Sequence, residues 1–175
     1  VRWYYKFFVP RYIAQAKHIF AVSEATKQDI IKQYKTSPTK ISIAYNGCRE
    51  EFKPASKEQI NNIRSQYSEG KPYLLFVGAM HPRKNVHHLI EGFDRFKDQT
   101  SSDYKLILVG RKAWLTEEID DAFTHAKHQS DIIFLPYLDK EELVWVTGAA
   151  WACVAPSYLE GFGVPVLEAL NCDVP

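Results

Sequence analysis

Two carboxylates near the end of the chain stand eight residues apart around a glycine-rich turn. The segment reads Glu160-Gly-Phe-Gly-Val-Pro-Val-Leu-Glu168, and it follows the apolar run Ala152-Cys-Val-Ala155. This order predicts a buried strand, a turn, and a helix over Pro165–Leu170 with proline in its first turn. Backbone N–H groups and the positive end of a helix dipole make such a turn a favourable site for phosphate.

The two carboxylates favour a different chemical group, because negative charges beside phosphate repel it. Carboxylates accept hydrogen bonds from hydroxyls, and hydroxyls next to phosphates describe a nucleotide sugar. Each residue also has a plainer explanation. Glu168 could complement the helix dipole from the first turn, Glu160 could be a solvated loop charge, and Gly161 and Gly163 could permit positive φ.

A second group of candidate residues follows another predicted strand. Gly78 ends that strand, and Arg83 and Lys84 come just before a helix whose predicted N-cap is Asn85. Two cations at a helix N-terminus oppose the usual dipole preference, so they indicate a bound anion or a nearby carboxylate. A solvated basic loop is the alternative. The glycine-rich patterns of dinucleotide-binding and P-loop proteins are absent.

The histidines do not form a convincing metal site. His81 has no carboxylate or second histidine at metal-ligand spacing. His125 and His128 are predicted to share one face of a helix that also carries Glu117 and Asp121, and a surface face is favoured over zinc there. No Ser-His-Asp or Cys-His arrangement for nucleophilic catalysis is visible.

Composition excludes several other classes of protein. The 22 Lys and Arg residues nearly balance the 21 Asp and Glu residues, so no basic field indicates a nucleic-acid partner. Cys48, Cys153 and Cys172 form no paired spacing, which suits a reducing compartment. We therefore expect a cytoplasmic protein, with peripheral contact to the inner membrane face left open. The aromatic segment Val1–Pro10 fits a membrane-interface helix, but a buried helix is favoured.

The remaining pattern predicts how these residues are positioned. Short apolar strands alternate with amphipathic helices from Tyr73 onwards, and such units predict a doubly wound parallel α/β sheet. The predicted strands are Tyr73–Val77, Lys105–Val109, Asp131–Leu135 and Ala152–Ala155. Ligands of these sheets bind outside the carboxyl ends of the strands, where the Gly78 and Glu160 loops both lie. The polar stretch ending at Pro54 indicates a domain boundary or hinge.

Several motifs together resemble one enzyme family. Ser157–Leu170 is similar to the E-x7-E signature of family 4 (group 1) retaining glycosyltransferases, whose GT-B architecture has two Rossmann-like domains facing a cleft. Phe76-Val-Gly-Ala-Met-His-Pro-Arg-Lys-Asn85 is similar to the family's diphosphate-binding segment. Ala44–Gly47, Leu106–Gly110 and Phe134–Leu143 fall in the family's order and spacing. One departure is Ala79, where many members carry arginine.

The resemblance implies a role for each candidate residue. Glu168 would hold the ribose hydroxyls, Glu160 the donor-sugar hydroxyls, and Arg83 with Lys84 the leaving diphosphate. The loop at Pro136–Leu138 would contact the base. Lys84 and Glu160 are thus the predicted catalytic residues, and the predicted donor-binding set is Gly78, Arg83, Lys84, Tyr137, Leu138, Glu160, Gly161, Phe162, Gly163, Val164 and Glu168.

The resemblance also implies a function and a domain arrangement. Residues 1–48 would be the tail of an N-terminal Rossmann-like domain together with the hinge. Residues 49–175 would form part of the nucleotide-sugar-binding domain, and both domains would be truncated.

The expected activity is sugar transfer from a nucleotide-diphosphate sugar to a glycan or lipid-linked acceptor, and GDP-mannose is the favoured donor. No metal or other cofactor is expected. This fragment alone is expected to be inactive, and any membrane contact would come through the missing N-terminal domain. The alternatives are a noncatalytic nucleotide-sugar-binding module and another GT-B enzyme such as a sugar-nucleotide epimerase.

Overall fold

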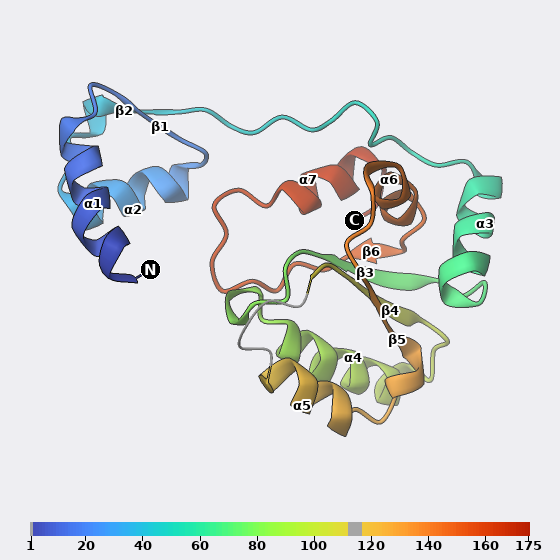
Figure 1. The fold of residues 1–175 in the computed structure, drawn as a ribbon. Helices are drawn as coiled ribbons and strands as arrows, with labels where there is room; N and C mark the ends of the chain where they lie inside the picture. Colours follow the sequence, from blue (N-terminus) through green and yellow to red (C-terminus); the bar gives the residue numbers. More distant parts are fainter. Residues whose placement is uncertain (1, 112–116) are drawn as a thin grey trace. The chain divides into compact units, whose positions relative to one another are not determined.

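The chain folds into two compact units, residues 1–47 and residues 48–175. A computed structural model describes residues 2–111 and 117–175, and Figure 1 shows their helices and strands. In the described part of the chain, no helix combines the length and the apolar character that a membrane span requires.

In its described residues, the first unit holds two α-helices, a 3₁₀ turn at Pro38–Lys40 and a two-stranded parallel sheet. Its elements are α1 (Arg2–Gln15), β1 (Ile19–Ala21), α2 (Glu24–Tyr34) and β2 (Ile41–Ile43). β1 pairs with β2 in the register Ile19 to Ile41. As predicted, Ser23 caps α2, since its side chain accepts a hydrogen bond from the backbone N–H of Thr26. The first helix is not buried within this unit, because Trp3 and Tyr5 are exposed.

The second unit is a parallel sheet covered by helices on both faces, which confirms the predicted fold class. Its strands are β3 (Tyr73–Val77), β4 (Lys105–Val109), β5 (Ile132–Leu135) and β6 (Ala152–Cys153), in the order β5-β4-β3-β6. All three pairings are parallel. β3 and β4 have the bounds that the apolar runs predict.

The α-helices of the described residues around this sheet are α3 (Lys57–Ser68), α4 (Val86–Thr100), α5 (Glu117–His125), α6 (Lys140–Gly148) and α7 (Val164–Asn171). In Figure 1, α4 and α5 lie on one face, while α6 and α7 lie on the other. Side chains alternate between the faces of a strand. Leu75 therefore packs with Val146 and Ala169 on the α6–α7 side, whereas Phe76 packs with Ile90 on the α4 side.

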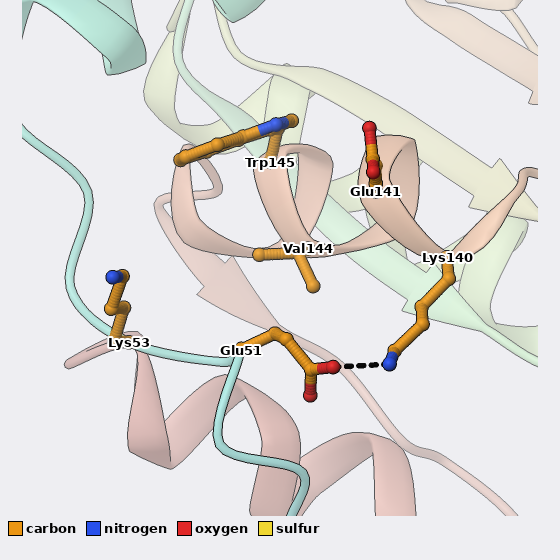
Figure 2. A pocket seen from close by; sticks show the side chains of 6 residues that line it. All are labelled: Glu51, Lys53, Lys140, Glu141, Val144 and Trp145. Atoms are coloured by element: carbon orange, nitrogen blue, oxygen red, sulfur yellow. Dashed lines mark hydrogen bonds and ion pairs between the residues drawn. The ribbon is translucent and has the colours of Figure 1, made fainter.

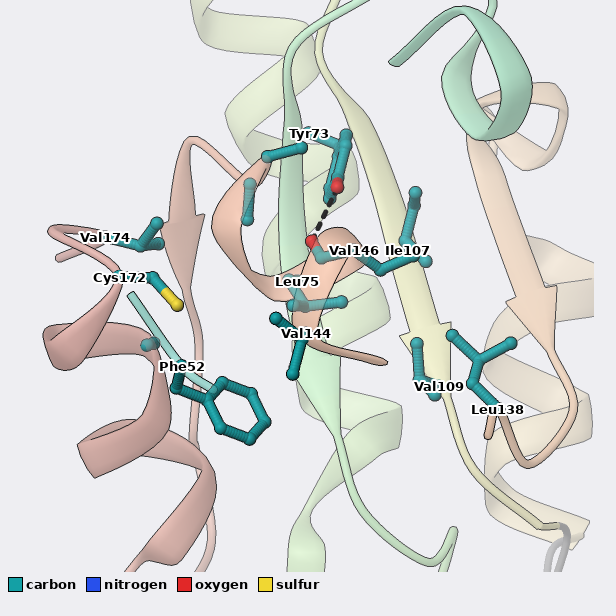
Figure 3. Close-up of a cluster of buried hydrophobic side chains, with 13 residues drawn as sticks. Phe52, Tyr73, Leu75, Ile107, Val109, Leu138, Val144, Val146, Cys172 and Val174 are labelled. Atoms are coloured by element: carbon teal, nitrogen blue, oxygen red, sulfur yellow. Dashed lines mark hydrogen bonds between the residues drawn. The ribbon is translucent and has the colours of Figure 1, made fainter. Parts of the chain in front are cut away.

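The chain that leads into this unit also packs against the core on the α6–α7 side. Figure 3 shows Phe52 packed beside α7 and the Tyr73 hydroxyl directed at the backbone of α6. Phe52 is buried, and the Tyr73 hydroxyl donates to the carbonyl of Val146 at 2.6 Å. Burial raises the pKa of the Cys153 thiol to about 11, as expected for a small hydrophobic side chain at the sheet.

Helix α3 is an element that the sequence reading missed. Ser56 followed by Gln59 is a capping-box signal in the sequence, and the structure contains that box. The Ser56 side chain accepts a hydrogen bond from the N–H of Gln59, and the Gln59 side chain accepts one from the N–H of Ser56. The same motif was recognised before α6, where Asp139 and Glu142 form the predicted capping box. The polar composition of α3 hid its apolar positions, Ile60 and Ile63, which pack against the core.

A buried charge network fixes the amino ends of β4 and β5. Asp131 lies 2.7 Å from the Lys97 ammonium and 2.9 Å from that of Lys105. Both lysines are buried. Partial burial raises the pKa of the Asp131 carboxyl, but the hydrogen bonds and charges of the two lysines outweigh it, so the net pKa lies below the ordinary value.

Candidate functional site

The loops after β3 and β6 meet because these two strands are neighbours in the sheet. The Lys84 ammonium forms a short ion pair with the Glu160 carboxylate, and Arg83 Nη1 lies 3.4 Å from the other carboxylate oxygen. The Arg83 guanidinium also donates to the carbonyl of Leu159 at 2.6 Å. The backbone N–H of Tyr158 donates to the Arg83 carbonyl at 3.0 Å. The structure thus brings both predicted cations to Glu160.

Asn85 strengthens the junction between these loops in a way that differs from the expectation. It is the N-cap residue of α4, as predicted, but its side chain makes no capping hydrogen bond. Its backbone is left-handed, with φ of 58°, a conformation that asparagine tolerates. The side-chain amide instead donates to the carbonyl of Pro156 at 3.1 Å. A short 3₁₀ turn, Pro82–Lys84, precedes it and sets the directions of the two cations.

The electrostatics of Glu160 are those of a paired carboxylate, not of a solvated loop charge. Partial burial raises the pKa of Glu160. The hydrogen bonds from Lys84 and Ser157 and the charges of Lys84 and Arg83 outweigh that effect, so the net pKa lies below its ordinary value. The Ser157 hydroxyl donates to Glu160 Oε1 at 2.8 Å. Ser157 belongs to the motif Ser157–Leu170, but no local pattern predicted its contact with Glu160.

Glu168 lies in the second turn of α7, so its expected position in the first turn is wrong. The first turn of α7 holds no acidic residue. The Glu168 side chain is only 8% exposed and pairs with Arg49, whose Nη2 lies 2.7 Å from Oε1. The helix-dipole explanation of Glu168 therefore fails, because its charge partner is a specific guanidinium. Arg49 was missed entirely by the sequence reading.

A cavity of about 430 Å³ opens at the carboxyl ends of β3, β4 and β5. Tyr137 is exposed at its edge, with the Arg111 guanidinium 5.1 Å from the centroid of its ring, whereas Leu138 is buried. The lining residues are Val77, Gly78, Ala79, Val109, Gly110, Arg111, Tyr137, Leu138 and Leu143.

Glycine is required at one point of this cavity. A β-carbon on Gly110 would lie 2.0 Å from the carbonyl oxygen of Gly78, so no side chain fits between the two strand ends. A β-carbon on Gly78 itself would lie 3.6 Å from Lys84 Cε. The backbone therefore forms this edge of the cavity, beside the Lys84 side chain.

The cavity and the paired cations lie on the same edge of the sheet. A small gap of about 10 Å³ is lined by Lys84, Glu160 and Gly163, and it shares Val77 with the larger cavity. Gly163, with φ of 89°, is the N-cap residue of α7. The other predicted residues of this turn differ in exposure: Gly161 is exposed, whereas Phe162 and Val164 are half-buried. Glu168 lines neither space.

Another cavity, of about 460 Å³, lies where the chain enters the second unit. Figure 2 shows Glu51 reaching Lys140 at the start of α6, with Trp145 and Lys53 nearby. The ion pair between Glu51 and Lys140 lowers the pKa of the Glu51 carboxyl. No residue of the predicted donor-binding set lines this cavity.

The described residues include no group of three or more His, Cys, Asp or Glu side chains arranged to hold a metal ion. The expectation that His125 and His128 share one helix face is wrong. Helix α5 ends at His125, and His128 precedes a separate 3₁₀ turn. His128 Nε2 instead lies 3.1 Å from Asp98 Oδ1, on the α4 side.

Comparison with known proteins identifies the family. The model of "Glycosyl transferases group 1" matches residues 58–175. The chain belongs to this family. Two curated relatives of this group 1 chain are the "O-antigen chain mannosyltransferase B" of Escherichia coli, 30% identical over 91% of this chain, and the "O-antigen chain mannosyltransferase RfbU" of Salmonella typhimurium, 30% identical over 98%. The chain spans 42% and 44% of their respective lengths.

Solved structures support the fold of this group 1 glycosyltransferase chain. The glycosyltransferase WaaG, described as involved in lipopolysaccharide biosynthesis, has a TM-score of 0.77 at 21% identity and covers 89% of this chain and 42% of its own. Anabaena HepE in complex with UDP-glucose has a TM-score of 0.80 at 21% identity and covers 91% of this chain and 44% of its own.

Proposed function

We propose that this chain carries the donor site of a retaining glycosyltransferase that uses a nucleoside diphosphate sugar. The acceptor would be a glycan or a lipid-linked glycan. The observation that carries the proposal is the convergence of Lys84, Arg83 and Glu160 at the carboxyl ends of two adjacent parallel strands. In such sheets this edge is where ligands bind.

The two cations suit the diphosphate that leaves the donor. When the bond between sugar and phosphate breaks, negative charge develops on the diphosphate, and fixed cations stabilise that charge more than they stabilise the ground state. The Arg83 guanidinium is held by the Leu159 carbonyl, and the Lys84 ammonium by Glu160. Their positions are therefore organised by the protein, which lowers the reorganisation that the reaction requires.

The other groups of the donor have complementary surfaces on the same edge. The cavity beside Gly78 and Gly110 offers an aromatic ring at Tyr137 and apolar walls, which suit a flat base. Glu160 would accept hydrogen bonds from sugar hydroxyls, and Glu168 from the ribose. Backbone N–H groups at residues 161–163 would face the phosphates and sugar, next to the N-terminus of α7.

Mannose from GDP-mannose is our proposed donor. Support comes from the two curated relatives, because both are named mannosyltransferases. We also propose front-face displacement, in which the acceptor hydroxyl attacks on the side from which the diphosphate leaves. The positive charge of Lys84 and Arg83 would make a divalent metal unnecessary.

A donor scan tests this function. The whole protein would be incubated with GDP-mannose, UDP-glucose or UDP-N-acetylglucosamine and with a mannose-terminated glycan, and both nucleoside diphosphate release and glycoside formation would be measured. We expect acceptor-dependent release from GDP-mannose, also in the presence of EDTA. Binding without any turnover would favour the noncatalytic module, and a changed sugar on an intact nucleotide would favour an epimerase.

A further inference from the structure

We infer that Arg49 is a positioning residue that presents one oxygen of Glu168 to the ribose diol of the donor. The inference rests on the proposed function, in which Glu168 binds the ribose. It assigns a role to a residue outside the predicted donor-binding set, at the point where the chain enters the second unit.

Both hydrogen bonds of the Arg49 guanidinium go to a single carboxylate oxygen. Nη2 donates to Glu168 Oε1 at 2.7 Å, and Nε donates to the same atom at 3.2 Å. A carboxylate has two oxygens with about four acceptor positions in total. Two of these are occupied on Oε1, while Oε2 accepts no hydrogen bond from the described residues. Two vicinal hydroxyls need two acceptor positions, which Oε2 supplies.

The burial of Glu168 explains why this carboxylate needs a partner. Its side chain is 8% exposed, and an unpaired charge at such a site is strongly unfavourable. Removing the guanidinium would leave the carboxylate without its partner and let it rotate towards water. That rotation would withdraw the ordered acceptor from the ribose.

The guanidinium is itself held in place from a second side. Its central carbon lies 4.8 Å from the centroid of the Phe52 ring, and Phe52 is buried in the core beside α7. Figure 3 shows this ring against the helix that carries Glu168. Arg49 is therefore oriented by a stacked ring and by a carboxylate, as expected for a preorganised contact.

The same stretch of chain offers a matched control. Glu51, two residues further on, forms an ion pair with Lys140 at the start of α6, as Figure 2 shows. That pair is half exposed and touches neither Glu168 nor the cavity beside Gly78. Glu51→Gln thus loosens the same stretch without disturbing the proposed ribose contact.

The test is calorimetric titration of the whole protein with the nucleoside diphosphate of the accepted donor, GDP for GDP-mannose, and with its 2′,3′-dideoxy analogue. Arg49→Ala should weaken GDP binding about tenfold, the scale of one misplaced charged hydrogen bond. Binding of the dideoxy analogue should change less than about twofold, because that ligand lacks the diol. Arg49→Lys, which keeps the charge, should recover part of the lost affinity, and Glu51→Gln should resemble the wild type.

The outcomes separate this inference from the proposed function. Equal losses for both ligands in Arg49→Ala would indicate a merely structural role and overturn the inference, as would tighter GDP binding. If Glu168→Ala weakens GDP while Arg49→Ala does not, only the inference fails. If Glu168→Ala leaves GDP binding unchanged, the ribose assignment fails at the level of the proposed function.

Discussion

At the scale of single residues, the candidate site is a set of charges that restrain one another. The Lys84 ammonium is mostly buried, with 13% of its side chain exposed, and Glu160 is its counter-charge. Glu160 also receives the Ser157 hydroxyl and lies near Arg83. Such a network keeps long side chains in fixed positions, which electrostatic stabilisation of a developing charge requires.

Replacement of Lys84 tests that role. In the whole protein, Lys84→Ala should lower kcat/KM roughly a hundredfold, the typical effect of removing one charge-stabilising donor. Lys71→Ala is the matched control, because Lys71 forms an exposed pair with Asp103 at the other end of β3. Steady-state kinetics with GDP-mannose would measure both variants. Wild-type kinetics in Lys84→Ala would exclude the diphosphate role.

At the scale of elements, the parallel sheet places the loops of the candidate site at one end and a buried charge network at the other. The loops after β3 and β6 hold Lys84 and Glu160 together. The opposite ends of β4 and β5 are joined by Asp131 between Lys97 and Lys105. We therefore expect substitutions at the first end to change ligand binding and substitutions at the second end to change the stability of the fold.

Removal of Asp131 should destabilise the fold. Asp131→Ala leaves two buried ammonium groups without this shared counter-charge, and we expect a loss of about 3 kcal/mol in the free energy of unfolding. Asp103→Ala, which removes an exposed partner of Lys71, should cost less than about 1 kcal/mol. Urea unfolding monitored by circular dichroism would give both values. Equal values for the two variants would contradict the structural role of the network.

The pH dependence of that difference follows from the pKa of Asp131. The folded-state pKa lies below the ordinary value, because the two lysines outweigh the effect of burial. The stabilisation is therefore fully present above the unfolded-state pKa of about 3.9, and it is lost as the pH falls through the folded-state value. The gap between wild type and Asp131→Ala should be constant from pH 7 to about pH 4 and shrink as the pH falls further.

Local sequence signals predicted elements well where they were strong. The apolar runs gave β3 and β4 with their observed bounds, and the capping signals gave the starts of α2 and α6. Helix α3 was missed because its amphipathic signal is weak in a polar stretch. The turn of α7 that carries Glu168 was misplaced, since the helix begins at Val164 and the glutamate follows one turn later.

At the scale of the whole molecule, contacts between distant segments were the part that the sequence could not predict. The partners Arg49 and Glu168 are separated by 119 positions. Only the folded sheet brings them together, and no local pattern at Arg49 indicates its partner. The proximity of Lys84 and Glu160 is easier to predict from the sequence, because parallel strands end at one edge of the sheet and both loops follow such strands.

The group 1 match covers residues 58–175, all of which lie in the second unit. It includes every predicted donor-binding residue. The chain spans less than half the length of the two mannosyltransferase relatives. Measurements of turnover therefore need the whole protein, whereas the donor contacts proposed above all lie within residues 48–175.

Calorimetric titration of Glu160→Ala and Glu168→Ala with GDP and with GDP-mannose tests the central claim most directly. Ribose is present in both ligands, so Glu168→Ala should weaken both by about 1.5–3 kcal/mol, the value of a charged hydrogen bond. The sugar is present only in the donor, so Glu160→Ala should weaken GDP-mannose and change GDP by less than about twofold. Loss of GDP affinity in Glu160→Ala alone would mean that the two roles are exchanged. Unchanged affinity for both ligands in both variants would contradict the donor site proposed here.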